Sequence, residues 1–203
     1  MPAKYYFKDQ SFEVFESVYP PSEDSELLAT AIRIQPFSDC LDMGCGTGIA
    51  GIQMAKNGAK SITFADQNPN ALKCAEQNVK INNIHCASRF IQTDLFTALP
   101  EKFDLIAFNP PYVPSDEIKW KDTDGGLNGR EVLDRFINEA GKHLNPNGQI
   151  FFLQNDQNGE KKTIQMLKAN GFEFELVSRQ KLFFEELIVF RCWKKTTEKS
   201  SVQ

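Results

Sequence analysis

The sequence predicts an α/β fold in which a parallel β-sheet carries helices on both faces. Short apolar runs alternate along the chain with longer segments whose apolar residues recur at helical spacing, which is the pattern of βαβ units. A glycine-rich turn, residues 44–48, follows the first well-defined run and opens a helix. A polar side chain stands at the end of each of the first four runs, where parallel strands present their carboxyl ends at one edge of a sheet.

Composition limits the size and the class of the protein. The chain has 203 residues, of which 41% are hydrophobic and 25% charged, enough for one domain with a sizeable core. A net charge of −4 argues against a nucleic-acid groove, which normally shows a basic excess. The five cysteines are scattered and the two histidines stand apart, so neither a disulfide framework nor a metal site is expected. Without a signal pattern or a long apolar run, we expect a soluble, cytoplasmic protein.

The two ends of the chain differ from its middle. Residues 1–18 are rich in aromatic side chains but lack a clear period, and we expect an irregular or short-strand lead-in. A stiff Tyr-Pro-Pro turn at 19–21 precedes a helix that starts at Ser22, a capping residue followed by acidic side chains in the first turn. The predicted domain spans 19–193, and the polar segment 194–203 is expected to be a disordered tail.

The elements of the domain follow one another at regular spacing. Gly58 ends one helix and Pro69 opens the next, as these residues commonly do. A turn is expected at 145–148, a short connection at 179–181, and a long polar loop at 113–128 that is functional or mobile. The expected strands are 38–43, 61–65, 88–92, 103–108, 149–153, 172–178 and 183–193. After the helix that starts at Ser22, the expected helices are 49–57, 70–81, 129–143 and 160–169.

Four polar residues at successive strand ends predict one shared crevice. Asp42, Asp66, Asp94 and Asn109 each fall at the end of an expected strand. Ligands of open α/β sheets bind beyond the carboxyl ends of the strands, near the point where strand order reverses. In nucleoside-binding sheets, the carboxylate that binds the ribose hydroxyls follows the glycine turn by about as many residues as Asp66 does here. Taken singly, each aspartate is equally typical of a turn or a cap, so the prediction of a nucleoside site rests on the set.

The charge beside the glycine turn selects among nucleoside ligands. Residues 46–51 match the GxGxxG pattern of NAD proteins, which is weak evidence by itself. A carboxylate at Asp42 would repel a pyrophosphate, which disfavours NAD, but it suits a cationic amino-acid tail such as that of S-adenosylmethionine. Asp94 can then accept from the adenine amino group, with Leu95 packed beside the ring.

The segment Asn109-Pro110-Pro111-Tyr112 is the most informative of the chain. It follows the apolar run 103–108. The residue before a proline favours extended backbone, and the prolines donate no N–H, which leaves nearby carbonyls free to accept from a ligand. The Asn109 side-chain oxygen and the Pro110 carbonyl can each accept one N–H of a flat –NH2 group, with the Tyr112 ring against its plane. Asn-Pro alone is also typical of a plain turn.

These motifs resemble those of a known family. The segment 42–48, which contains the glycine turn, and the segment 109–112, which we call the shelf, resemble the corresponding motifs of class I S-adenosylmethionine-dependent methyltransferases. These enzymes act on amide or exocyclic amino nitrogens. The segments 19–25, 125–136 and 178–180 resemble, more narrowly, the eukaryotic and archaeal, Mtq2-type branch of the HemK-like family. The resemblance covers most of the chain.

The resemblance implies both a fold and a reaction. The implied fold is a single Rossmann-like methyltransferase domain with a mostly parallel, seven-stranded sheet and an antiparallel last strand. The implied reaction transfers a methyl group to N5 of the glutamine in the GGQ motif of a class 1 release factor, with catalytic roles for Asn109, Pro110 and Tyr112. The implied cofactor-binding residues are Tyr19, Ser25, Asp42, Gly44, Gly46, Gly48, Asp66, Asp94, Leu95 and Asn109.

The resemblance also implies a partner, a small zinc-binding, Trm112-like activator subunit that covers an apolar surface. Seventeen phenylalanines, with Phe90 and Ile91 on a probable edge strand, fit a covered edge, although phenylalanine is also a common core residue. The runner-up function is an adenine-N6 or other nucleic-acid amino methyltransferase, because the shelf suits a flipped base as well. A third interpretation, a non-catalytic binding module, is disfavoured because the glycines and Asn109 are all present.

Overall fold

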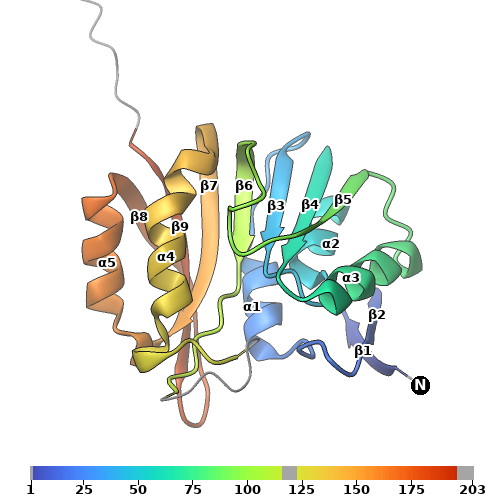
Figure 1. The fold of residues 1–203 in the computed structure, drawn as a ribbon, viewed down its shortest axis with the longest axis horizontal. Coiled ribbons are helices and arrows are strands. Elements are labelled where there is room, and N and C mark those ends of the chain that lie inside the picture. Colours follow the sequence, from blue (N-terminus) through green and yellow to red (C-terminus); the bar gives the residue numbers. More distant parts are fainter. Residues whose placement is uncertain (1, 116–122, 196–203) are drawn as a thin grey trace, which may run out of the picture.

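A seven-stranded sheet organises the computed structural model, which describes residues 2–115 and 123–195 (Figure 1). The strand order is β5-β4-β3-β6-β7-β9-β8. The strands from β5 to β7 are parallel, and β9 runs antiparallel to both of its neighbours. The strands are β3 (Asp39–Met43), β4 (Ser61–Asp66), β5 (Ala87–Gln92), β6 (Phe103–Phe108), β7 (Leu144–Asn155), β8 (Phe172–Lys181) and β9 (Glu186–Lys194). The predicted mixed sheet is therefore confirmed, with β3 at the switch point where strand order reverses.

Helices cover both faces of this sheet. Strand β6 alternates, with Leu105 and Ala107 on the face of the first three helices and Ile106 and Phe108 on the face of the last two. The helices are α1 (Glu23–Ala31), α2 (Ile49–Lys56), α3 (Pro69–Ile81), α4 (Glu131–Ala140) and α5 (Glu160–Ala169), with short 3-10 turns η1 (Leu127–Gly129), η2 (Gly141–His143) and η3 (Asp156–Asn158). No helix among the described residues is long and apolar enough to cross a bilayer.

Two of the predicted connections are wrong. Strand β7 already begins at Leu144, so the turn expected at 145–148 lies inside the strand. The turn residues lie at an irregularity in the pairing of β7 with β6. Asn145 stabilises this irregular stretch by donating a hydrogen bond to the Asp104 carboxylate at 2.8 Å. Strand β8 continues to Lys181, beyond the connection expected at 179–181, because Arg179 pairs across the hairpin with Glu186 at 2.8 Å. The connection is residues 182–185.

The first helix begins where the sequence predicts, but its cap differs. Ser22 occupies the N-cap position of α1 without making a side-chain cap hydrogen bond. Its hydroxyl instead donates to the Glu23 carboxylate at 2.7 Å. The hydroxyl is thus engaged by a neighbouring acid and does not accept from a backbone N–H of the first turn.

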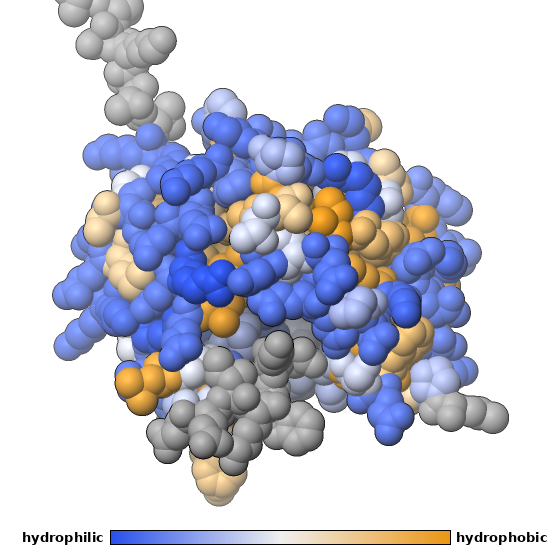
Figure 2. Space-filling model, in the orientation of Figure 1, coloured by the Kyte–Doolittle hydropathy of each residue, from blue (hydrophilic) through white to orange (hydrophobic). Residues whose placement is uncertain are grey.

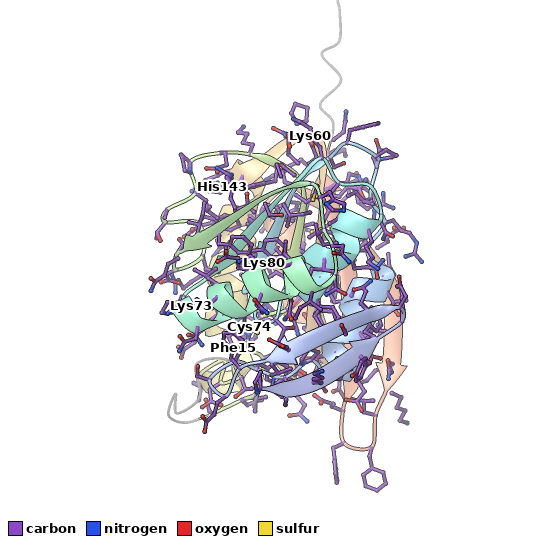
Figure 3. The ribbon with its side chains drawn as sticks, turned by 90° about the vertical axis from the view of Figure 1, so that its right-hand side faces the viewer. Phe15, Lys60, Lys73, Cys74, Lys80 and His143 are labelled. Carbon is purple, nitrogen blue, oxygen red and sulfur yellow. The ribbon has the colours of Figure 1, made fainter. Side chains whose placement is uncertain are left out.

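The N-terminal lead-in is a β-hairpin that joins the domain through α3. Strands β1 (Ala3–Phe7) and β2 (Gln10–Val14) pair antiparallel, and Phe15 packs next to Cys74 of α3 (Figure 3). The buried Asn78 side chain accepts from Glu13 N–H at 2.8 Å and donates to Glu13 C=O at 2.9 Å. It also donates to Thr47 C=O at 3.0 Å, in the glycine turn. Asn78 therefore ties the hairpin to the glycine turn. The disordered tail is expected at 194–203, but Lys194 still belongs to β9; residues 196–203 lie outside the described residues.

Removing this tie is expected to destabilise the fold. Asn78→Ala removes the side-chain acceptor of the Glu13 N–H and the donor to the Thr47 C=O, and leaves the Glu13 C=O with the Cys74 thiol as its side-chain donor. Losing these bonds at a partly buried position costs about 1–3 kcal/mol of unfolding free energy. Asn70→Ala on the same helix removes only an exposed hydrogen bond to Ser17 and is the matched control, expected to change stability by less than about 0.5 kcal/mol. Urea denaturation measures both. Equal effects of the two substitutions would contradict the role given to Asn78.

Candidate functional site

A cavity of about 770 Å³ opens at the carboxyl ends of β3, β4 and β6. The shelf residues 109–112 line it together with Val113, and so do residues 43–47 at the glycine turn. Residues 16–18 line it too, so the segment predicted as a separate lead-in contributes directly to the cavity wall. The predicted site residues that line the cavity are Tyr19, Ser25, Asp42, Gly44, Gly46, Asp66, Leu95, Asn109, Pro110 and Tyr112.

Two predicted site residues lie outside the cavity wall. Gly48 is at the N-cap of α2 with a φ of +82°, a left-handed conformation that glycine adopts readily. Asp94 faces the surface, where its carboxylate accepts from Gln67 at 2.8 Å and from Arg135 at 2.8 Å. The neighbouring Leu95 is buried and lines the cavity. The adenine-binding role given to Asp94 therefore stays a prediction. In the ligand-free structure, both carboxylate oxygens of Asp94 accept hydrogen bonds from other side chains.

The glycine turn is held by the two aspartates at the strand ends. Asp66 accepts from Gly46 N–H at 3.0 Å and from Asn68 N–H at 2.8 Å, so this carboxylate links the turn to the start of α3. Asp42 is buried and accepts from Gly51 N–H at 2.8 Å, in the first turns of α2. Both carboxylates line the cavity and are oriented by backbone donors.

Among the described residues, the side chains that line the cavity include acidic but no basic ones. Its described lining residues include four acidic side chains, Glu16, Asp24, Asp42 and Asp66, of which Asp42 is protonated below about pH 8 in the ligand-free fold, and include no lysine, arginine or histidine. Negative groups in a partly enclosed space favour a cationic ligand and disfavour a phosphate. Among the described residues, no three His, Cys, Asp or Glu side chains are grouped so as to hold a metal ion.

Burial of Asp42 gives the protein a testable pH dependence. Burial raises the pKa of this carboxyl from its usual value to about 8. Between about pH 4 and pH 8 the unfolded chain ionises Asp42 while the folded chain retains the proton, so stability falls as pH rises through this window. Asp42→Asn keeps an acceptor for Gly51 N–H and removes the titration.

We therefore expect Asp42→Asn to stabilise the ligand-free protein at pH 8 by at least about 1 kcal/mol, and by less at pH 5. Urea denaturation at the two pH values measures the difference. A variant whose stability varies with pH as the native protein does would show that Asp42 is ionised in the fold throughout.

The Asn109 side chain is fixed in one orientation. Its amide nitrogen donates to the Asp24 carboxylate at 2.9 Å. Its oxygen, Oδ1, is buried and has no hydrogen-bond partner among the described residues, although the residue lines the cavity. A buried acceptor without a partner costs free energy in the ligand-free fold, so it is suited to accept an N–H from a ligand.

Asp24 is a residue of the cavity wall that sequence reasoning missed. It is only 3% exposed, and its Oδ2 accepts from Asn109, from the Tyr112 hydroxyl at 3.1 Å and from the Tyr19 hydroxyl at 3.4 Å. Burial, with the negative charge of Asp24 next, raises the pKa of Tyr19 to about 12, and the same two causes raise that of Tyr112. Both phenols therefore remain protonated and donate to Asp24.

A signal for Asp24 was present in the sequence. The position of Asp24 in the first turn of a helix indicates one of the acids that favour a helix start, and it belongs to the segment 19–25 that carries the family resemblance. It stands four residues before Leu28 and eight before Ile32, which places it on the apolar face of α1, and both of those residues are buried. An acid on the buried face of a helix requires partners, and here the donors come from segments distant in sequence.

Comparison with known proteins agrees with this geometry. Residues 21–184 match the family described as Methyltransferase small domain. A putative protein N5-glutamine methyltransferase of Methanocaldococcus jannaschii is 44% identical over 87% of this chain and 92% of its own. Methyltransferase HEMK2 of Homo sapiens is 32% identical over 78% of this chain and 81% of its own.

A solved structure is similar as well. The E. cuniculi Mtq2–Trm112 complex, described as responsible for methylation of the eRF1 translation termination factor, contains a chain that is 26% identical to this one. The match has a TM-score of 0.73 and covers 88% of this chain and 99% of that one. With its family match across most of the domain and its parallel sheet, glycine turn and Asn-Pro-Pro-Tyr shelf, this chain belongs to the Methyltransferase small domain family.

Proposed function

We propose that this protein transfers a methyl group from S-adenosylmethionine to the side-chain nitrogen, N5, of the glutamine in the GGQ motif of a class 1 release factor. The observation that carries the proposal is that Asn109 lines the cavity while its Oδ1 is buried and has no hydrogen-bond partner among the described residues. Because the Asn109 nitrogen is occupied by Asp24, its oxygen is the atom available to a substrate N–H. The functions named for the similar proteins of M. jannaschii and E. cuniculi support the same substrate class.

The residues of the cavity fit S-adenosylmethionine. The acidic lining suits the ammonium and sulfonium charges of this cofactor, and Asp66 stands at the end of β4, the usual place of a ribose-binding carboxylate. Asp42 and the glycine turn would hold the amino-acid end, and Leu95 would pack beside the adenine. When bound, the cofactor supplies an already activated methyl group on a sulfonium.

The chain's own residues orient the glutamine amide. The amide nitrogen is a poor nucleophile because its lone pair is delocalised into the carbonyl. Asn109 Oδ1 and the Pro110 carbonyl accept its two N–H groups, and the Tyr112 ring lies against the plane of the amide. Such fixed acceptors position the nitrogen for in-line attack, and the extra proton leaves after transfer, so no strong base is needed. We assign Asn109, Pro110 and Tyr112 to substrate binding on this basis.

Mass spectrometry of the substrate tests the proposal. The purified protein, alone and together with a Trm112-like subunit, is incubated with S-adenosylmethionine and a class 1 release factor, and the peptide that contains the GGQ motif is sequenced. We expect a single added methyl group on the glutamine side chain, and none on a release factor in which that glutamine is replaced by alanine. Parallel reactions with DNA and RNA test the alternative, and methylation of a nucleic acid with an unmodified GGQ peptide would reverse the assignment.

The exposed edge of the sheet supports an activator subunit. Within the described part of the chain, strand β5 has a neighbouring strand on one side only, and Figure 2 shows apolar residues gathered over this edge. Phe90 is half-buried there and stacks on Phe64 at 5.1 Å. An apolar edge strand is a place where another chain can pair or cover the sheet. We assign this edge to a Trm112-like subunit and the reaction to the cytoplasm, where translation terminates. Full activity of the purified chain alone would make the subunit dispensable.

A further inference from the structure

The turn between β8 and β9 carries two exposed aromatic side chains. Phe183 is 92% exposed and Phe184 is 86% exposed, more than any other large apolar side chain among the described residues. Their rings contact each other edge to face, with centroids 4.7 Å apart. The turn is Leu-Phe-Phe-Glu, without the glycine, asparagine or proline that turns normally use. Two phenylalanines in water at this position offer no packing to the fold, so they are available to a partner.

The hairpin tip lies at the same edge of the sheet as the cavity. Figure 1 shows it projecting at the lower edge, where β6 and β7 also end and where the shelf leaves the sheet. The space-filling view shows an apolar tip in the corresponding position (Figure 2). A protein that presents a glutamine to the cavity would therefore face the tip as well.

A chain of buried hydrogen bonds fixes the tip relative to the shelf. The Asn158 side chain donates to Tyr112 C=O at 2.8 Å. Asn158 and Asn155 exchange two further hydrogen bonds in a capping box around η3. Asn155 then donates to the Glu185 carboxylate at 2.8 Å, and Glu185 C=O accepts from Leu182 N–H at 2.8 Å, which closes the turn. Asn155 and Asn158 are each at most 2% exposed, so the two bonds between them are shielded from water, and the bonds at either end are partly buried.

We propose that the Phe183–Phe184 tip is a docking element for the folded release factor, outside the glutamine loop that enters the cavity. The proposal rests on the proposed function. A cavity of about 770 Å³ holds the cofactor and one side chain, so recognition of a folded protein requires contacts beyond it. Exposed aromatic side chains on a rigid support are the groups that contribute most at protein interfaces. The acids Glu185 and Glu186 next to the tip disfavour insertion into an anionic membrane instead.

Steady-state kinetics with two substrates test this proposal. The double variant F183S/F184S is compared with the native protein on the intact release factor and on a short synthetic peptide spanning the GGQ motif. With the intact factor we expect KM to rise roughly 10- to 100-fold and kcat to stay within about twofold, because the tip contributes to association only. With the peptide, which is too short to reach the tip, we expect no change in kcat/KM.

Phe37→Ser is the matched control. Phe37 is 81% exposed, like the tip residues, but it precedes β3 and therefore lies at the opposite edge of the sheet. We expect it to leave KM for the intact factor unchanged. An unchanged KM in F183S/F184S would overturn the proposal, as would an equal loss on the peptide, because the tip would then act through the cavity.

Two further outcomes separate this proposal from others. If light scattering shows a dimer of the native chain that becomes a monomer in F183S/F184S, the tip joins two copies of this chain and the proposal is overturned. If the native protein, with the Trm112-like subunit present, methylates neither the release factor nor the peptide, the proposed function fails and the docking proposal fails with it. A native protein that methylates both, with F183S/F184S indistinguishable from it, leaves the function standing and removes the docking role alone.

Discussion

Asn109→Ala is expected to lower kcat for glutamine methylation by roughly 100- to 1,000-fold, the usual cost of removing one preorganised hydrogen-bonding group from a reaction centre. The substitution removes the acceptor Oδ1 and leaves the glycine turn, Asp42 and Asp66 intact. Binding of S-adenosylmethionine should therefore change little. Single-turnover kinetics with bound cofactor measure the chemical step, and calorimetry with the cofactor alone measures binding.

Asn145→Ala is the matched control for this experiment. Asn145 also donates its amide nitrogen to an aspartate, Asp104, at 2.8 Å, but it does so at the opposite edge of the sheet. We expect it to leave the single-turnover rate unchanged. Near-native methylation by Asn109→Ala, or a comparable loss in Asn145→Ala, would show that the shelf does not hold the substrate amide.

Asp24→Asn is expected to lower kcat by roughly 10- to 100-fold and the free energy of unfolding by about 1–3 kcal/mol. Among the described residues, the hydrogen-bond partners of this carboxylate are all donors: Oδ2 accepts from Asn109, Tyr112 and Tyr19, and Oδ1 accepts from the N–H and the hydroxyl of Ser25. An asparagine has the same shape but must turn an NH2 toward one of these two sets. Its donors then face other donors, and either the orientation of Asn109 or the first turn of α1 is lost.

The matched control is Glu23→Gln, which makes the same charge change on the adjacent, exposed residue of α1. We expect native kinetics and stability from it. Asp24 acts through Asn109, so its substitution should change kcat more than the affinity for S-adenosylmethionine. A variant Asp24→Asn with native kcat and lower stability would limit Asp24 to a structural role.

The strand-end pattern predicted the parallel part of the sheet and much of the cavity. Asp42, Asp66 and Asn109 follow short apolar runs, and the alternation of strand and helix leaves one topology in which these ends meet. Glycine and proline residues form the turns beside them, so the turns that the local sequence favours are the turns that the whole fold requires at these positions. The correct predictions thus rest on features whose physical cause is local.

The features that sequence reasoning missed depend on contacts between distant segments. Asp24 meets Asn109 across 85 residues of chain, and Asn78 meets Glu13 across 65. The turn predicted at 145–148 has the residues of a turn, but pairing with β6 and the hydrogen bond from Asn145 to Asp104 hold it in the sheet. Hydrogen-bond partners of this kind follow no periodic pattern and no fixed spacing in the sequence, and they meet only in the folded chain.

The central claim is that Asn109 holds the substrate amide in front of the methyl donor. A crystal structure of the protein with S-adenosylhomocysteine and a peptide containing the GGQ glutamine tests it most directly. The distance to measure joins Asn109 Oδ1 and the glutamine side-chain nitrogen. We predict a hydrogen bond of about 2.8–3.1 Å, with the nitrogen aimed at the cofactor sulfur. A glutamine nitrogen more than about 4 Å from Oδ1, or a glutamine bound outside the cavity, would contradict the claim.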